Sequence, residues 1–326
     1  MGASPPAPSP GGPEPALAGA PETDLSVIVL SWNTADLSLA CLASLAQHPY
    51  RGPHEVLFVD NASEDGSADR VAAAFPEVRV LRNARNLGWS EGNNVGLRAA
   101  RGRWLLLLNS DTEVRPRTLD RLVEFLRARP GAGCVGARHV YPDGRLQATC
   151  VRFPTLATAV TFDTLLARLP WGRRHLDRYF MRDFDHRSTR EVDQVPGSCL
   201  LLPREVVRRI GLLDEKLWLY FNDVDLCLRV RAAGLGVWFL PEAEVLHHHH
   251  ASTRKFSWFA VHWHLDQVAY YRKHFGWRGV LAARLTGLYV AAREVWRLVV
   301  LRRAARGSMG RDVRFVVRAL ARVLTS

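Results

Sequence analysis

The polar residues that directly follow a run of leucines are the part of this sequence best suited to chemistry. Residues 105–108 are all leucine, and Asn109, Ser110 and Asp111 come next. A continuous apolar run predicts a strand buried on both faces of a parallel sheet, and ligands of open α/β sheets bind beyond the carboxyl ends of such strands. The carboxylate of Asp111 and the amide oxygen of Asn109 are hard donors that suit Mg²⁺ or Mn²⁺ on a diphosphate. A simple helix start is the alternative, because Ser110, Asp111 and Thr112 all favour the cap of a helix.

A second group of carboxylates lies in residues 219–229, which read LYFNDVDLCLR. A carboxylate at the start of a helix suits a general base that takes a proton from an attacking hydroxyl group. The structural alternative is an ordinary helix start, in which Asn222 is the cap and the helix dipole favours Asp223 and Asp225. The two interpretations are compatible. We expect Asp225 to be structural or to pair with Arg229.

Alternating strands and helices predict the frame that positions these groups. Residues 25–30, 55–59 and 78–81 are apolar or β-branched runs, and apolar residues recur at helical spacing in residues 37–45. This order is typical of a right-handed parallel α/β sheet. The glycines do not have the G-x-G-x-x-G spacing of a dinucleotide-binding loop, which counts against a dehydrogenase.

Two polar segments after these strands offer contacts to a nucleotide. Asp60 ends the second strand, where its carboxylate can accept the N3–H of a uracil or thymine ring. A turn in which Ser63 caps the next helix is the alternative. Residues 86–96 hold three glycines and three asparagines, and we expect a loop that lets backbone and amide groups approach a nucleotide closely. A plain glycine-bearing loop is the alternative there.

Composition limits the partners and the compartment. The net charge is +12, and residues 271–326 account for +11 of it, with 13 Lys and Arg against 2 acidic residues. Five widely spaced cysteines without a C-x-x-C pair fit a reducing compartment better than a disulfide framework or a zinc site. Residues 1–23 lack a basic n-region and an apolar h-region and predict a disordered leader. No apolar run is long enough to predict a membrane-spanning helix.

The basic C-terminal part of the chain suggests a membrane partner. Arginines at positions 311, 314, 318 and 322 fall on one helical stripe, and apolar residues cover much of the remainder. Such a helix is typical of a membrane interface, so we expect residues 280–326 to bind an anionic membrane surface. A solvated helix packed on the rest of the protein is the alternative. Nucleic-acid binding is not expected, because no helix-turn-helix, RNA-binding sheet or zinc module is present.

Three motifs, in order, resemble one known family. They are VDNASEDGS in residues 59–67, NLGWSEGNNVG in residues 86–96 and LLNSD in residues 107–111. They are similar to the family-2 inverting glycosyltransferases of GT-A fold, and most similar to the rhamnosyltransferase-like branch, over about residues 25–252. The resemblance implies an α/β fold with a Rossmann-like, mostly parallel central sheet flanked by helices and a C-terminal helical extension.

The same resemblance implies the domain organisation. The GT-A domain is expected over residues 24–257, with a nucleotide-binding half at 24–135 and an acceptor half at 136–257. Residues 140–195 are expected to be a variable insertion on the acceptor side. A strand over residues 195–202 and a helix over 204–210 follow it. Residues 258–326 are expected to form the basic, aromatic and amphipathic helical tail.

The resemblance also implies the residues of the site. Asp223 is the expected catalytic base, and Asp111 and His247 are the expected ligands of Mn²⁺ or Mg²⁺, with His248 and the next two histidines at the surface. The expected contacts to the nucleotide sugar are Ser31, Asn33, Asp60, Asn86, Gly88, Asn94, Asn109 and Asp111. The expected acceptor-side residues are Gly197, Ser198, Asn222 and Asp225. Asn109 and Asn222 stand where the family usually has Asp and Glu.

The expected enzyme is a metal-dependent inverting hexosyltransferase. It moves a sugar from a dTDP- or UDP-type nucleotide-diphosphate sugar, with dTDP-rhamnose the leading donor by resemblance, to a hydroxyl group of a lipid-linked or polysaccharide glycan. A cytoplasmic, peripheral position on the inner face of the cell membrane fits such an acceptor. One alternative is a galactosyl-, galactofuranosyl- or GlcNAc-transferase of the same fold. Another is a catalytically inactive, sugar-nucleotide-binding membrane scaffold, which the two asparagines at positions 109 and 222 suggest.

Overall fold

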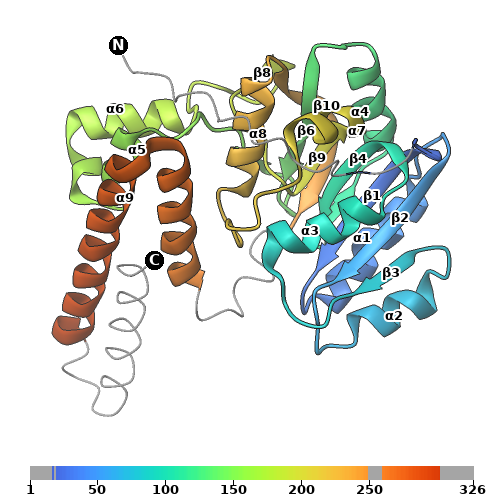
Figure 1. Cartoon of the computed structure of the whole chain (residues 1–326), viewed down its shortest axis with the longest axis horizontal. Helices are drawn as coiled ribbons and strands as arrows, with labels where there is room; N and C mark the ends of the chain where they lie inside the picture. Colours follow the sequence, from blue (N-terminus) through green and yellow to red (C-terminus); the bar gives the residue numbers. More distant parts are fainter. Residues whose placement is uncertain (1–16, 18–19, 249–258, 302–326) are drawn as a thin grey trace.

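Four parallel strands make the first half of the central sheet in the computed structural model, which describes residues 17, 20–248 and 259–301 (Figure 1). They lie side by side in the order β3-β2-β1-β4. Their bounds are β1 (Thr23–Ser31), β2 (His54–Asp60), β3 (Arg79–Arg82) and β4 (Gly102–Asn109). The four leucines of β4 are buried, which confirms the strand predicted to be covered on both faces.

The second half of the sheet is mixed in direction. Strand β9 (Cys199–Pro203) runs antiparallel between β4 and β6 (Ala132–Val140), and β10 (Gly236–His247) pairs in parallel with β6. Strand β5 (Thr112–Val114) closes the edge beside β10, and the short strands β7 (Leu146–Gln147) and β8 (Arg190–Glu191) pair with β6 and β10. Strand β9 is shorter than the strand predicted over residues 195–202.

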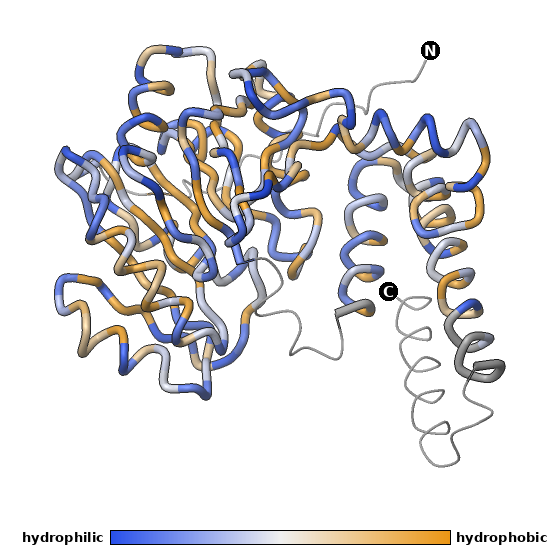
Figure 2. The backbone as a smooth tube through the Cα atoms, turned by 180° about the vertical axis from the view of Figure 1, so that it is seen from behind, coloured by the Kyte–Doolittle hydropathy of each residue, from blue (hydrophilic) through white to orange (hydrophobic). Residues whose placement is uncertain are grey.

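Helices cover both faces of the sheet. Helices α1 (Ala35–Gln47), α2 (Ser67–Ala74) and α4 (Thr118–Arg127) contribute to the apolar core on one face. Helices α3 (Gly88–Ala99), α7 (Arg204–Ile210) and α8 (Asn222–Ala232) contribute to the core on the other face. Hydrophobic segments accordingly run through the strands between the two layers (Figure 2). The predicted fold class is confirmed, as is the helix predicted over residues 204–210.

The loop predicted over residues 86–96 is wrong for most of its length, because α3 begins at Gly88. The glycines serve close packing of this helix on the sheet: a Cβ atom on Gly96 would lie 2.4 Å from Cγ2 of Ile28. Asn94 is fully buried, and its side chain donates to the carbonyl of Leu213 at 2.9 Å and accepts from its N–H at 3.0 Å. This side chain therefore joins α3 to the segment before α8 and does not line a nucleotide-binding loop.

A group of helices lies to one side of the sheet (Figure 1). It contains α5 (Leu156–Thr161), the 3₁₀ helix η1 (Leu165–Arg168), α6 (Pro170–Tyr179) and α9 (Phe259–Leu301). Helix α9 reverses direction at Gly276, whose φ of 59° and ψ of −146° are not helical, so it consists of two arms. Tyr270 and Tyr271 of its first arm are buried against α5 and the start of α8. No helix among the described residues is long and apolar enough to span a membrane.

Some predictions concern residues that the structure does not describe. Most of the leader predicted at residues 1–23 lies outside the described residues, as do residues 249–258 and the arginine stripe predicted at 311–322. Within the leader, Leu17 is buried and its carbonyl accepts a hydrogen bond from Nε of Arg208 at 3.1 Å. The domain boundaries at 24–257 and 258–326 stay predictions.

Candidate functional site

The carboxyl ends of β2, β1 and β4 bring several of the predicted nucleotide-binding residues to one edge of the sheet. In the strand register Ser31 lies opposite Asp60, and Leu30 lies opposite Asn109. Asp111 follows β4 by two residues. This edge is where parallel α/β sheets bind their ligands, so the strand order alone gathers side chains that are up to 80 residues apart in sequence.

One carboxylate oxygen of Asp60 accepts no hydrogen bond among the described residues. Its side chain is 5% exposed, and Oδ2 accepts from the backbone N–H of Ser63 at 3.2 Å. Among the described residues, Oδ1 is buried without a hydrogen-bond partner. A buried carboxylate oxygen that lacks a donor is unfavourable by the desolvation cost of the group. A ligand with an N–H group would satisfy it.

Ser31 and Asn33 stabilise the loops at this edge. The buried Ser31 hydroxyl shares hydrogen bonds with Thr34 at 3.0 Å and Ser38 at 2.8 Å. Oδ1 of Asn33 accepts from the backbone N–H of Glu64 at 2.8 Å. Ser31 therefore supports the edge from within the protein, whereas Asn33 joins the loop after β1 to the loop after β2.

Asn61 holds the segment that precedes α3, and it was missed in the sequence. Its Nδ2 donates to Oδ1 of Asn86 at 2.9 Å and to the carbonyl of Gly88 at 3.0 Å. Its Oδ1 accepts from the N–H of Leu87 at 3.0 Å. Asn86 and Gly88 are thus fixed beside the end of β2, and their positions depend on one buried amide.

Trp89 is a second residue that the sequence did not single out, although it lies within a quoted motif. Its indole N–H donates to Oδ1 of Asn109 at 3.0 Å, and its backbone N–H donates to the carbonyl of Trp218. The backbone N–H of Asn109 donates to the carbonyl of Ser198 at 3.0 Å. Asn109 therefore orients Trp89 and binds the loop before β9, in addition to any contact with a ligand.

Asp111 and His247 are brought together from opposite ends of the predicted domain. Oδ1 of Asp111 lies 3.4 Å from Nε2 of His247, and both side chains are almost buried. Burial alone would raise the pKa of Asp111, but hydrogen bonding and the charge of His247 lower it below its ordinary value. Asp111 is consequently a carboxylate at neutral pH.

The orientation of His247 suits a metal ligand. Nε2 of Gln147 donates to the backbone carbonyl of His247, which leaves Oε1 of Gln147 to accept from Nδ1 of the same residue at 3.0 Å. This contact uses Nδ1, so Nε2, on the side of Asp111, is the ring nitrogen that can bind a metal ion. A hydrogen bond on the far ring nitrogen is the usual support of a ligating histidine.

The oxygen and nitrogen donors of this pair fit Mn²⁺ or Mg²⁺. Two donors 3.4 Å apart can share one ion with bonds of about 2.1 Å. Within residues 17, 20–248 and 259–301, no group of three His, Cys, Asp or Glu side chains is placed to hold a metal ion.

A series of contacts leads from this pair to the predicted base. The rings of His247 and His139 meet edge to face with centroids 5.5 Å apart, and Nε2 of His139 lies 2.8 Å from Oγ of Ser198. The next residue toward the N-terminus, Gly197, donates its backbone N–H to Oδ2 of Asp223 at 3.2 Å. His139 was missed in the sequence, where nothing marks it as close to these residues.

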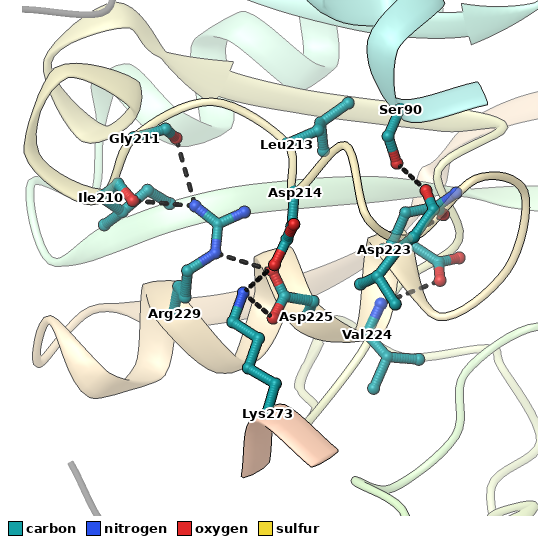
Figure 3. A network of polar contacts seen from close by, with 12 residues as sticks. Ser90, Ile210, Gly211, Leu213, Asp214, Asp223, Val224, Asp225, Arg229 and Lys273 are labelled. Atoms are coloured by element: carbon teal, nitrogen blue, oxygen red, sulfur yellow. Dashed lines mark hydrogen bonds and ion pairs between the residues drawn. The ribbon is translucent and has the colours of Figure 1, made fainter. Parts of the chain in front are cut away.

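Asp223 has the environment of a general base. Its Oδ1 accepts from the backbone N–H of Val224 at 2.8 Å (Figure 3). The backbone N–H of Gly197 binds the other oxygen. Burial raises the pKa of Asp223 above its ordinary value, although the bonds to Gly197 and Val224 partly oppose this shift. A raised pKa makes the ionised carboxylate a stronger proton acceptor.

Gly197 lies between the predicted base and Trp89. A Cβ atom at position 197 would lie 2.6 Å from two carbons of the Trp89 ring and 3.5 Å from Cβ of Asp223. No larger residue fits here without moving one of these two side chains. Gly197 therefore lies beside the predicted base, and the acceptor-side role of Gly197 and Ser198 stays a prediction.

The roles predicted for Asn222 and Asp225 need correction. Phe221, with a left-handed φ of 60°, is the residue that precedes α8, so Asn222 is its first residue and not its cap. Asp225 is fully buried and binds Nε of Arg229 at 2.8 Å and Nζ of Lys273 at 2.7 Å (Figure 3). The predicted pairing with Arg229 is confirmed. A buried, fully paired carboxylate offers no surface to an acceptor.

Asp266 on α9 holds the loop before α8. Its carboxylate accepts the backbone N–H groups of Trp218 at 3.0 Å and of Leu219 and Tyr220 at 2.8 Å each. Burial raises its pKa to about 6, against the effect of these three bonds. Because this loop also binds Trp89 and leads into Asp223, α9 helps to position both residues.

The fold and the site together define a class of protein. A mostly parallel sheet carries polar groups and a carboxylate–histidine pair beyond the ends of its strands, and contacts through Gly197 lead from them to the half-buried carboxylate of Asp223, as in GT-A glycosyltransferases. The family model described as "Glycosyltransferase like family 2" matches residues 21–265. The chain belongs to glycosyltransferase family 2, and it is a glycosyltransferase enzyme.

Two relatives and one solved structure illustrate the similarity. The N-acetylglucosaminyl-diphospho-decaprenol L-rhamnosyltransferase of Mycobacterium tuberculosis is 29% identical over 282 residues, which are 80% of this chain and 91% of that protein. The uncharacterized protein y4gI of Sinorhizobium fredii is 34% identical over 234 residues, or 70% of this chain, but the match spans only 25% of that longer protein.

The solved structure is a mannosyltransferase from Pyrobaculum calidifontis in complex with GDP-Man and Mn²⁺. It superposes with a TM-score of 0.53 at 17% identity, over 94% of this chain and 88% of that chain. At this identity the likeness shows the fold alone. The predicted GT-A fold and family are confirmed.

Proposed function

We propose that this protein is a metal-dependent inverting glycosyltransferase that moves a sugar from a nucleotide-diphosphate donor to a hydroxyl group of a lipid-linked glycan. The observation that carries this proposal is the continuous series of contacts from Asp111 and His247, through His139 and Ser198, to Gly197 and Asp223. These contacts link an ion-binding pair and a proton acceptor at one edge of the sheet.

In this proposal each part of the site has one task. Asp60 accepts an N–H from the base, which favours uracil or thymine over cytosine at the N3 position. Asp111 and His247 would hold a divalent ion, which would supply positive charge for the departing nucleoside diphosphate. Asp223 takes the proton of the acceptor hydroxyl as that oxygen attacks the anomeric carbon from the side opposite the leaving group. A single displacement of this kind inverts the anomeric configuration.

The particular donor and acceptor rest on similarity. The mycobacterial relative is named as a rhamnosyltransferase that acts on N-acetylglucosaminyl-diphospho-decaprenol. We propose a dTDP-rhamnose donor and a polyprenyl-diphosphate-linked acceptor, with the enzyme placed peripherally at the inner face of the cell membrane. A galactosyl-, galactofuranosyl- or GlcNAc-transferase and an inactive scaffold are the competing proposals.

A thermal-shift panel tests the donor class. Wild-type protein and Asp111→Ala are heated with dTDP- and UDP-sugars in Mn²⁺, in Mg²⁺ and in chelator. A ligand at a hundred times its dissociation constant adds about 2.7 kcal/mol to the free energy of unfolding, which is easily visible. We expect one dTDP-sugar to stabilise the wild type only when metal is present, and Asp111→Ala to lose the metal effect. Folded wild-type protein that responds to no nucleotide would contradict the proposal.

A further inference from the structure

The exposed large apolar side chains of the described residues are confined to the helices beside the sheet. They fall in two short segments, residues 165–171 of η1 and α6 and residues 277–296 of the second arm of α9. They are Leu165, Leu166, Leu169, Trp171, Trp277, Leu281, Leu285, Leu288 and Trp296. A soluble surface rarely gathers so many apolar side chains without a binding role.

The exposed residues of α9 form one stripe. At 100° per residue, positions 277, 281, 285, 288 and 296 fall within an arc of about 100°, which is the width of one helix face. The stripe extends over about 28 Å of helix, with an exposed tryptophan at each end. Tryptophan is enriched at the boundary between lipid and water.

The two segments are neighbours in the structure. Thr286 donates its hydroxyl to the carbonyl of Ala159 at 2.7 Å, and Arg293 donates to the carbonyl of Asp163 at 2.8 Å. Leu165, the first exposed apolar residue of the other segment, is only two residues after Asp163 in the sequence. Figure 1 shows α5 and α6 packed at one end of the second arm of α9, away from the central sheet.

The charge beside these apolar residues is mostly positive. Residues 165–174 contain three arginines and no acidic residue, and residues 272–296 contain five basic residues and one acidic residue, Glu294. The exposed ones include Arg168, Arg173, Arg174, Arg272 and Arg278. A symmetric dimer through this face would place like charges together. An anionic lipid surface complements both the apolar stripe and the arginines.

We infer that residues 165–174 and 272–296 form a lipid-docking surface that seats the enzyme on an anionic bilayer. This inference rests on the proposed function in one respect, because a lipid-linked acceptor is presented at such a bilayer. The surface overlaps the membrane-binding segment predicted at residues 280–326 over residues 280–296, adds residues 165–174 and 272–279, and does not depend on the arginine stripe at residues 311–322. It lies on α9, the helix whose Asp266 and Lys273 bind the acceptor-side loop and Asp225.

Vesicle co-sedimentation of the full-length chain tests this surface. Vesicles of phosphatidylcholine alone are compared with vesicles that also contain phosphatidylglycerol, at low and high salt. The apolar variant is Trp277→Ser/Leu281→Ser/Leu285→Ser, and the charge variant is Arg168→Glu/Arg173→Glu/Arg174→Glu. We expect the wild type to bind the anionic vesicles and each variant to bind about tenfold more weakly or worse.

Further measurements distinguish lipid binding at this surface from lipid binding by the predicted arginine stripe and from dimer formation. Arg103→Glu removes an exposed arginine from the start of β4 and should bind like the wild type. A variant with glutamate at positions 311, 314 and 318 tests the predicted stripe. Loss of vesicle binding in that variant but not in the charge variant would overturn the inference. So would a wild-type dimer, measured by sedimentation velocity, that the apolar variant loses while vesicle binding is unchanged.

Failure of this inference and failure of the proposed function give different results. Stabilisation by nucleotide sugars is measured on the same variants, and we expect it to be unchanged because none of the substituted residues lies at the carboxyl edge of the sheet. Wild-type protein that binds nucleotide sugar but no vesicles overturns the docking surface alone. Vesicle binding without any nucleotide response supports the docking surface and contradicts the transferase proposal.

Discussion

The backbone N–H of Gly197 donates a 3.2 Å hydrogen bond to Oδ2 of Asp223, across 26 residues of sequence. The same glycine leaves room for Trp89, whose ring would meet any side chain at position 197. The bond therefore fixes the proposed base relative to Trp89, the residue that Asn109 orients. Position 197 therefore sets the distance between Trp89 and Asp223 without contributing a side chain.

Replacement of Gly197 by alanine should lower kcat by about a hundredfold, because a displacement of about 1 Å is enough to lose alignment with the reacting carbon. Donor affinity should change little, since the nucleotide residues lie on β1, β2 and β4. Steady-state kinetics with varied donor separate the two effects. Gly131→Ala is the matched control, because an added Cβ atom there meets nothing within 4 Å. Equal kcat in the two variants would contradict this positioning role.

Replacement of Asp60 by alanine should weaken binding of uridine and thymidine nucleotides about tenfold to a hundredfold, the usual value of a hydrogen bond to a charged group. Discrimination against cytidine nucleotides, which have no N3–H, should fall by a similar factor. Isothermal titration with each nucleotide measures both quantities. Unchanged discrimination would show that Oδ1 of Asp60 does not contact the base.

Replacement of Gln147 by leucine should reduce metal affinity without removing a ligand. The variant loses the bond between Gln147 and Nδ1 of His247, and loss of such a support typically costs about tenfold to a hundredfold in affinity. The Mn²⁺ concentration for half-maximal rate measures the effect. His248→Ala is the control, since that ring pairs with Glu113 at 2.8 Å. A larger loss of Mn²⁺ affinity in His248→Ala than in Gln147→Leu would indicate that His248, and not His247, is the metal ligand.

Replacement of Asp266 by alanine should destabilise the protein by about 2 kcal/mol or more, because three backbone N–H groups lose their acceptor. The loss should depend on pH. The pKa of Asp266 is raised from 3.8 to about 6 in the folded protein, so the native state binds more protons between these values. Its contribution to stability is present at low pH and decreases as pH rises through about 6.

Urea unfolding of wild type and Asp266→Ala at pH 5 and pH 7 checks this sign. The difference in unfolding free energy should be larger at pH 5. If the difference in unfolding free energy between wild type and Asp266→Ala is larger at pH 7 than at pH 5, folding favours the ionised form of Asp266, which would contradict the raised pKa. Transfer activity should also fall, because the loop bound by Asp266 leads to the base.

Local patterns in the sequence were enough to predict the frame of the site. Four leucines in a row predict β4, and an aspartate at the end of an apolar run predicts the position of Asp60 at the sheet edge. The pairing of Asp111 with His247 was expected only through the family resemblance, because no spacing rule links residues 136 positions apart. The structure supplies that link through β10, which returns beside β5.

Other features depend on tertiary contacts that sequence spacing does not contain. The glycines of residues 86–96 suggested a loop, but they allow α3 to approach Ile28. Asn222 looked like a helix cap, yet the left-handed residue Phe221 takes that position. His139, Gln147 and Asp266 act through partners more than 45 residues away. Their types alone gave no reason to select them.

The most direct test of the central claim is the rate and stereochemistry of transfer by wild type and Asp223→Asn. The substrates are dTDP-rhamnose and a short polyprenyl-diphosphate N-acetylglucosamine, with Mn²⁺ present, and Asp143→Asn, an exposed turn residue, is the control. We predict a product of inverted anomeric configuration and a loss of about a hundredfold to ten-thousandfold in kcat for Asp223→Asn, with donor binding kept. Retained configuration, or a rate equal to that of the control, would contradict the account.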